Sequence, residues 1–195
     1  MDAKDLYEWA KSENRVYPLK ENYDFAGAEH QVWFDDHVEG RVMKAAVSPK
    51  TIGFDANGEL TLVEEKSIEA YIDRKRIHNA LFHEDFRLEG VCISEEGRVI
   101  PLVSQPILEG DNPELFEIED YFKAKGMKCV LPHIKGWYSE ELDILVADAH
   151  PRNLVRTKTG VSVFDLVITR SKNVTKLIRE FAIQPELKDS NLDEL

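Results

Sequence analysis

One segment near the C-terminal end of the chain sets two carboxylates and an amide around a hairpin signal. It extends from Val146 to Arg170 and its sequence is VADAHPRNLVRTKTGVSVFDLVITR. The apolar runs on either side of KTG predict two strands joined by a turn. The returning strand would bring Asp165 back beside Asn153, and Asp148 would lie in the loop that follows the preceding strand. The segment therefore predicts a cavity toward which three oxygen-bearing side chains point.

These residue types suit phosphate chemistry with a divalent cation. An aspartate can accept a proton from a hydroxyl nucleophile, which makes Asp148 a candidate base. Asn153 and Asp165 offer one neutral and one anionic oxygen, and Mg²⁺ would take its remaining ligands from water and from the phosphates of a nucleotide. Asp, Asn and Pro are also common turn formers, so turn formation explains the segment about equally well.

A lysine in an apolar strand adds a positive charge to this hypothesis. Lys44 lies within GRVMKAA, flanked by Val, Met and two alanines. A buried ammonium needs an anionic partner. The helix predicted over Ser67–Phe82 offers Glu69 and, one turn on, Asp73 on the same face. The alternative is that Lys44 lies at a sheet edge and extends its amine into solvent.

The pattern of the whole chain predicts an α+β fold. Four strands interrupted by one helix, and followed by a linker after Gln105-Pro106, predict a small sheet lobe. The rest would form a second, more helical lobe, with a ligand cleft between the two. In the first half the expected elements are a helix over Asp2–Asn14, strands near Glu29–Phe34 and Gly40–Val47, a loop over 48–63, a helix over Ser67–Phe82 capped by Ser67, and two strands around SEEGR. In the second half they are a helix capped by Asn112 and ended by Gly126, the hairpin around KTG, and a helix over Asn173–Ile183.

Charge and hydropathy limit the possible partners. The chain has 25 Lys and Arg against 37 Asp and Glu, a net charge of −12, which argues against nucleic-acid backbones and anionic membranes as partners. The N-terminus is charged and no apolar run approaches membrane-spanning length, which indicates a cytosolic protein. Cys92 and Cys129 fit no metal-binding spacing and each lies in an apolar run, which predicts two buried free thiols.

The order of these features resembles the protein-kinase-like fold. Lys44, a helix acid, DAHPRN and VFD follow one another along the chain, and DAHPRN is similar to the Asp-x-His-Pro-x-Asn loop of small-molecule phosphotransferases. More narrowly, GAEHQVWFDDHVEGRVMK, YIDRKRIHNALFHEDFRLEGV, LVSQPILEG and DAHPRNL resemble the serine/threonine/tyrosine kinase-like domain of polyvalent proteins, which are multidomain proteins of phages and conjugative elements. The resemblance covers Gly27 to Ile168. It implies one compact two-lobed domain over 1–195, with an antiparallel-sheet N-lobe over about 15–105, a linker over 104–108, a reduced C-lobe over about 109–185 and a frayed acidic tail over 186–195.

The resemblance implies a binding site for ATP. Lys44 would hold the α- and β-phosphates, with Glu69 as its ion-pair partner and Asp73 as the competing choice. The segment DFAGAEH, with Gly27, would lie over the phosphates. The backbone of the linker would bind adenine, and its contact residues are Ser104, Gln105 and Ile107.

The resemblance also implies the catalytic and metal-binding residues. Asp148 would be the catalytic base, and Asn153 and Asp165 would be the ligands of Mg²⁺. His150 matches the histidine of the loop pattern and is expected to brace the loop.

Two functions follow from this pattern. The first is an ATP- and Mg²⁺-dependent phosphotransferase that acts on a hydroxyl of a protein or a small molecule. The second is an inactive kinase-like module, from a phage or mobile element, that binds a nucleotide or another protein. The second is considered because DFAGAEH has only one glycine, Leu-Val follows Asp165, and about 30 residues remain after it for the C-lobe.

Overall fold

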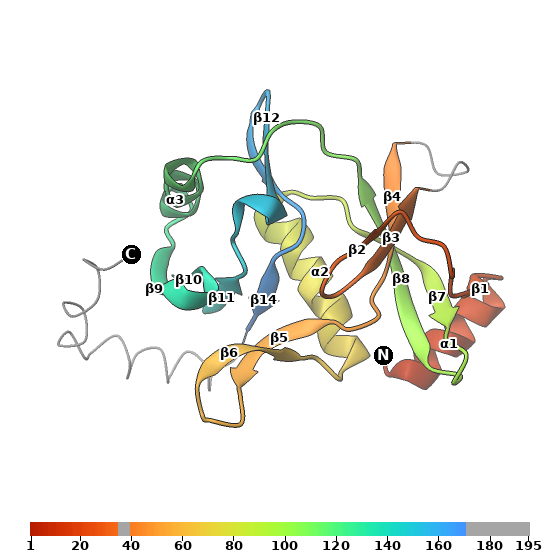
Figure 1. The fold of residues 1–195 in the computed structure, drawn as a ribbon. Helices are drawn as coiled ribbons and strands as arrows, with labels where there is room; N and C mark the ends of the chain where they lie inside the picture. Colours follow the sequence, from red (N-terminus) through yellow and green to blue (C-terminus); the bar gives the residue numbers. More distant parts are fainter. Residues whose placement is uncertain (35–39, 171–195) are drawn as a thin grey trace.

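The computed structural model describes residues 1–34 and 40–170 (Figure 1). Within these ranges there are three α-helices and four sheets, so the predicted α+β class is confirmed. No helix within these ranges is both long and apolar enough to cross a membrane. The helix predicted over Asn173–Ile183 and the acidic tail lie outside the described residues.

The first half of the chain folds around a six-stranded sheet with the strand order β1-β7-β8-β4-β3-β2. β1 runs parallel to β7, and the other neighbours are antiparallel. The two strand pairs predicted around DDHVEG and SEEGR belong to this sheet and are confirmed. The strands are β1 (Val16–Pro18), β2 (Phe25–Ala26), β3 (Gln31–Phe34), β4 (Arg41–Ala45), β7 (Arg87–Ile93) and β8 (Val99–Pro106).

Two helices pack against this sheet and share one apolar core with it, α1 (Ala3–Ser12) and α2 (Ile68–Phe82). The Asp2 carboxylate accepts hydrogen bonds from two backbone N–H groups of the first turn of α1, at 2.8 and 2.9 Å. The Ser67 hydroxyl accepts one from the first turn of α2, at 3.1 Å. The predicted cap at Ser67 is therefore confirmed, and Asp2 caps α1. Each cap satisfies backbone donors that a helix start leaves without partners.

Within the described residues the second half of the chain contains one α-helix, two short 3-10 helices (Pro132–Ile134 and Pro151–Asn153) and six strands. The prediction of a more helical lobe is therefore wrong for this part. The N-cap of α3 is Glu114, not Asn112, and its N–H donates to the Glu117 carboxylate at 2.8 Å. The hairpin predicted around KTG is confirmed as β12 and β13. The elements are α3 (Leu115–Ala124), β9 (Lys128–Leu131), β10 (Gly136–Ser139), β11 (Ile144–Ala147), β12 (Leu154–Thr157), β13 (Gly160–Val163) and β14 (Val167–Thr169), of which four form a sheet in the order β14-β11-β10-β9.

The stretch predicted as a loop over 48–63 is instead a hairpin of β5 (Lys50–Phe54) and β6 (Leu60–Glu64). Apolar side chains of this hairpin, among them Ile52, pack in one core with Leu145 and Val167 of the β14-β11-β10-β9 sheet. The hairpin follows β4 in sequence but contacts β14, and Figure 1 shows it below α2. It therefore ties the two halves of the molecule together.

The helix α2 lies between the six-stranded sheet and the second half of the chain (Figure 1). Its buried residues include three that are basic, Arg74, Lys75 and His78. A helix covered on two faces has little surface left for polar residues, so part of its charge must be buried and paired.

The two cysteines differ in exposure. Cys92 is buried as predicted, but the predicted burial of Cys129 is wrong, because its side chain is exposed.

Candidate active site

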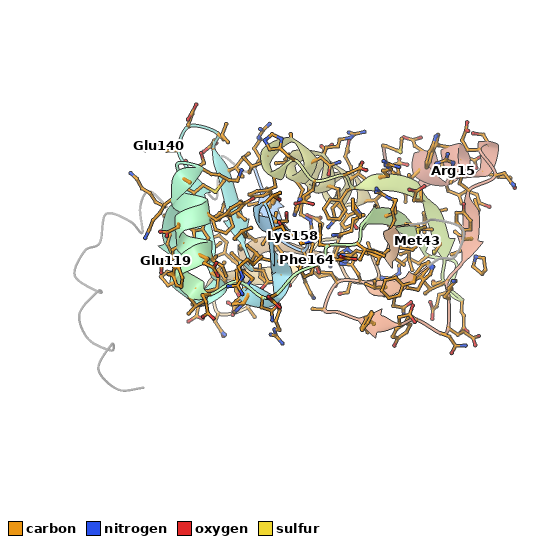
Figure 2. The ribbon with its side chains drawn as sticks, turned by 90° about the horizontal axis from the view of Figure 1, so that it is seen from above. Arg15, Met43, Glu119, Glu140, Lys158 and Phe164 are labelled. Atoms are coloured by element: carbon orange, nitrogen blue, oxygen red, sulfur yellow. The ribbon has the colours of Figure 1, made fainter. Side chains whose placement is uncertain are left out.

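A pocket of about 460 Å³ lies between the six-stranded sheet and the β12–β13 region. Figure 2 looks down on this arrangement and shows Phe164, one of the lining residues, between Met43 of the sheet and Glu119 of α3. Six of the residues predicted to form the site line this one pocket: Gly27, Lys44, Gln105, Ile107, Asn153 and Asp165. Residues that are distant in sequence therefore meet at one cavity.

One part of the pocket is lined by apolar and aromatic side chains. Phe25 and Phe34, on neighbouring strands, lie with their ring centroids 6.2 Å apart at an interplanar angle of 79°. Val42 and Val155 line the same pocket. Apolar walls with a few polar groups are what pockets for small organic ligands usually offer.

The linker after β8 borders this apolar part with its backbone. The Ile107 N–H donates to the Gly40 carbonyl at 2.9 Å, so this donor is already satisfied. In the β4–β8 ladder Gln105 pairs with Val42, and alternate residues of an antiparallel strand direct their backbone groups to opposite sides. The Pro106 carbonyl therefore points away from β4, and Pro106 and Leu108 both line the pocket.

Ser104 is buried in β8 and does not line the pocket. Its hydroxyl accepts a hydrogen bond from the Arg41 guanidinium at 2.9 Å and donates one to the Glu89 carboxylate at 2.6 Å. Its carbonyl accepts a bond from Arg41 at 3.2 Å. Ser104 therefore does not border the pocket in which adenine is predicted to bind, and these groups already have partners inside the sheet.

The loop after β11 brings Asp148 and Asn153 together. The Asn153 side-chain N–H₂ donates to the Asp148 carbonyl at 2.9 Å and to its carboxylate at 2.8 Å. Asp148 has φ of +61°, a left-handed conformation that Asp tolerates better than most residues. Because the amide nitrogen of Asn153 is held in this way, its oxygen is directed away from Asp148 and is available to a cation.

The carboxylate of Asp148 is about one third exposed. Partial burial raises its pKa, and the hydrogen bond from Asn153 opposes that rise. His150 lies nearby, with its Nε2 3.8 Å from the carboxylate, and its backbone carbonyl accepts the Asn153 N–H at 2.8 Å. Asp148 is thus reachable from solvent while the backbone of the loop is held by hydrogen bonds.

Asp165 follows β13 and faces several positively charged or titratable side chains. Its Oδ1 lies 3.5 Å from His30 Nδ1 and 4.0 Å from Lys75 Nζ. Burial alone would raise the pKa of Asp165, but Lys44, His30 and Lys75 together hold it well below its usual value. The carboxylate is therefore ionised and its charge is largely balanced by side chains.

Lys44 is buried in β4, as the sequence predicts. Its ammonium donates to the Phe164 carbonyl at 3.4 Å and lies 5.4 Å from the centroid of the Phe164 ring. Burial lowers the pKa of Lys44, and the charges of Asp165 and Glu29 oppose that change. The acids that act on Lys44 are therefore in the loop before β3 and in the segment after β13.

The predicted partners of Lys44 on α2 are wrong. Glu69 is exposed and pairs with the N-terminal ammonium at 3.1 Å, and Asp73 is exposed and pairs with Arg76 at 2.9 Å. The helix is rotated so that Tyr71, Arg74, Lys75 and His78, which follow i, i+3, i+4 and i+7 spacing, are the buried ones. This spacing is present in the sequence, but it is a weak signal because charged residues are rare at buried positions of a helix.

Three further residues contribute to this site. Glu29 and His30 end the segment DFAGAEH, which is predicted to lie over the phosphates, and Lys75 is not predicted from the sequence. The buried Glu29 carboxylate accepts two hydrogen bonds from the Arg74 guanidinium, at 3.0 and 2.6 Å. The His30 Nε2 lies 3.0 Å from the Tyr71 hydroxyl. The loop before β3 is thereby held against α2 by a carboxylate of the loop and a cation of the helix.

Two groups of oxygen and nitrogen atoms could hold a metal ion. Ligand atoms of Glu29, His30 and Asp165 lie within 4.8 Å of one another. Glu29 is already bound by Arg74, however, so a cation there would have to displace an ion pair. The Asn153 amide oxygen and the Asp165 carboxylate border the same pocket, and a neutral and an anionic oxygen suit Mg²⁺ with phosphate ligands.

A protein-family model matches most of the chain. The model of a family described as serine/threonine/tyrosine kinases found in polyvalent proteins matches residues 1–172. No curated protein matches the chain.

Proposed function

Because the chain belongs to the family of serine/threonine/tyrosine kinases found in polyvalent proteins, we propose that it is an ATP- and Mg²⁺-dependent phosphotransferase. Its acceptor would be a hydroxyl group of a protein or a small molecule, and the chain would act as one kinase-like domain of a phage or mobile-element protein. The observation that carries the proposal is that Lys44, Asn153 and Asp165 border one pocket of about 460 Å³. Phosphoryl transfer needs a lysine and two cation ligands around one phosphate site.

The nucleotide would bind with its base in the apolar part of the pocket. The Pro106 carbonyl and the Leu108 N–H would accept and donate one hydrogen bond each at the edge of adenine. Phe25 and Phe34 would contact the ring system, and Lys44 would bind phosphate oxygens. The depressed pKa of the buried Lys44 reflects its burial, so a phosphate beside it would favour the charged ammonium.

Asn153 and Asp165 would hold Mg²⁺, which would neutralise charge on the phosphates. The Asn153 amide nitrogen is bound to Asp148, which keeps the amide oxygen oriented for a cation. The same hydrogen bond fixes the Asp148 carboxylate.

Asp148 would act on the acceptor. Its carboxylate would accept the proton of the acceptor hydroxyl while the hydroxyl oxygen forms a bond to the γ-phosphorus of ATP. The bond between this phosphorus and the β,γ-bridging oxygen would break, and ADP would leave. Asp148 has a left-handed backbone conformation, and its N–H donates a hydrogen bond to the Ile134 carbonyl at 2.9 Å. Together these two features fix the direction of the side chain.

One observation favours the second candidate, a nucleotide-binding module without transfer. Asp165, the negatively charged residue proposed to bind Mg²⁺, already lies beside the side chains of His30 and Lys75. A cation must compete with both, so a nucleotide could bind with little or no transfer.

Binding and transfer are best tested separately. Thermal denaturation with ATP, with and without Mg²⁺, measures binding, because a ligand at 100 times its Kd stabilises the folded state by about 2.7 kcal/mol. Loss of γ-phosphate from labelled ATP, to protein or to water, measures transfer. We expect Asp148→Asn to retain ATP stabilisation and lose transfer, and Asp165→Asn to lose the Mg²⁺-dependent part of the stabilisation.

The matched control is Asp73→Asn, which removes an exposed carboxylate of α2. It should change neither measurement. The phosphotransferase proposal is wrong if Asp148→Asn and Asp165→Asn transfer phosphate as the unmodified protein does. ATP stabilisation in the absence of any transfer would favour the second candidate.

A further inference from the structure

Three buried polar atoms converge beside the pocket without a hydrogen bond to any described residue. They are His30 Nδ1, Lys75 Nζ and Asp165 Oδ1. The carboxylate oxygen lies 3.5 Å from the first and 4.0 Å from the second, so it is held by charge at distances beyond an ordinary hydrogen bond. It can therefore accept a closer partner without breaking a hydrogen bond.

The ammonium of Lys75 is held in place by aromatic rings. Its Nζ lies 4.4 Å from the centroid of the Phe86 ring and 5.4 Å from that of Tyr71, both suitable for cation–π attraction. The side chain is 5% exposed. Long side chains that are packed in this way keep one position, so the Lys75 amine is fixed in place. Burial lowers its pKa to about 7, and the neighbouring Asp165 carboxylate favours its charged form.

Asp165 is the acid with which this charge pairs. The other nearby carboxylate, Glu29, is bound by two hydrogen bonds to Arg74. The remaining neighbours that act on Lys75, Arg74 and Lys44, are cations and repel it. Because a buried cation needs an anion, the position of the Asp165 carboxylate and that of the Lys75 ammonium depend on each other.

Lys75 does not line the nucleotide pocket, so its effect on a bound nucleotide must pass through Asp165. We propose that Lys75 is a positioning residue whose ammonium acts as a built-in counter-ion of Asp165 and sets how much Mg²⁺ the site requires. This inference rests on the proposed function, because it needs Asp165 to be a ligand of Mg²⁺. Lys75 is the residue of α2 that lies beside the site, where the sequence predicts a carboxylate.

Lys75 and a bound Mg²⁺ would compete for the same carboxylate. An ammonium and a divalent cation that approach the same carboxylate repel each other, and a unit charge a few ångströms away changes a binding constant by at least about tenfold even at a high effective dielectric constant. Removal of the Lys75 charge should therefore tighten Mg²⁺ binding. Loss of a residue that merely supports the fold would weaken it or leave it unchanged.

The experiment measures, at a pH below the Lys75 pKa of about 7, the Mg²⁺ concentration that gives half of the ATP-dependent thermal stabilisation. Lys75→Met removes the charge and keeps an apolar side chain over Phe86, and Lys75→Gln is a second neutral variant if the first folds poorly. Lys75→Arg keeps the charge. The matched control is Arg76→Met, which removes an exposed positive charge from the next position of α2.

We expect the half-saturating Mg²⁺ concentration to fall at least about tenfold in the neutral variants and to stay at the level of the unmodified protein in Lys75→Arg and Arg76→Met. An unchanged or higher requirement in both neutral variants overturns the role of Lys75, while ATP and Mg²⁺ still stabilise the unmodified protein. If they do not stabilise the unmodified protein, the proposed function fails, and the inference about Lys75 falls with it.

Discussion

The ion pair between Glu29 and Arg74 should contribute more to stability than any exposed pair on α2. Both side chains are nearly fully buried and joined by two hydrogen bonds, at 2.6 and 3.0 Å. Glu29→Gln keeps the shape of the side chain but leaves the Arg74 cation in the interior without its counter-ion. Removal of one partner of a buried pair costs about 3–5 kcal/mol.

Urea denaturation followed by circular dichroism measures this loss as a lower free energy of unfolding. For a protein of this size about 1 kcal/mol corresponds to about 2–4 °C, so the midpoint of thermal unfolding should fall by about 6–20 °C. The exposed pair Asp73–Arg76 lies on the same helix and is the matched control. Asp73→Asn should cost no more than about 1 kcal/mol, because solvent screens an exposed pair.

A double-mutant cycle separates the pair from its surroundings. Arg74→Met alone should also be strongly destabilising, since it leaves Glu29 buried and unpaired. Glu29→Gln combined with Arg74→Met should be more stable than the sum of the two losses implies, by at least about 1 kcal/mol. If Glu29→Gln and Asp73→Asn lower the free energy of unfolding equally, the buried pair does not hold the loop before β3 against α2.

Three further results are expected. In the native protein a thiol reagent should modify the exposed Cys129 and leave Cys92 unmodified, because burial raises the pKa of Cys92 to about 12. Mass spectrometry of the intact protein should show one adduct before denaturation and two after it. Two adducts on the native protein would contradict the burial of Cys92. Ile52→Ala should lower the free energy of unfolding by about 2–5 kcal/mol in urea denaturation, because Ile52 lies in the core between the β5–β6 hairpin and the second sheet, whereas a loss below about 1 kcal/mol would mean that the hairpin does not dock there. Gly90→Ala should also lower the midpoint of thermal unfolding, because Gly90 has φ of +153° and an added Cβ would collide with the Arg15 carbonyl. Gly58→Ala is the control, because its added Cβ meets open space and only its positive φ is unfavourable. An equal fall of the midpoint in both variants would argue against the close approach of β1 to β7.

Much of the fold could be predicted from local sequence signals. Capping residues and spacing located α1 and α2, and alternation located the strands on either side of DDHVEG and SEEGR. These elements depend on hydrogen bonds and side-chain periodicity within short segments, which neighbouring residues determine. The β5–β6 hairpin was missed because its many turn residues outweighed two short alternating runs.

Part of the candidate site could be predicted as well, because Lys44, Asn153 and Asp165 occur in the order that the family resemblance requires. Their meeting at one pocket depends on contacts between residues more than 100 positions apart, such as the bond from the Lys44 ammonium to the Phe164 carbonyl. No local signal encodes such a contact.

By itself the sequence determined most of the strands of the six-stranded sheet and the two helices that pack on it. It also determined the identity of the residues that approach the pocket from β4 and from the two loops around β12–β13. Only the tertiary structure decided which face of α2 turns inward, and thereby put Lys75 rather than Glu69 beside the site. The physical reason is that apolar and charged residues alternate around this helix, so its rotation is not set by its own pattern. It is set by packing between two sheets and by the pairing of Arg74 with Glu29, a residue 45 positions away.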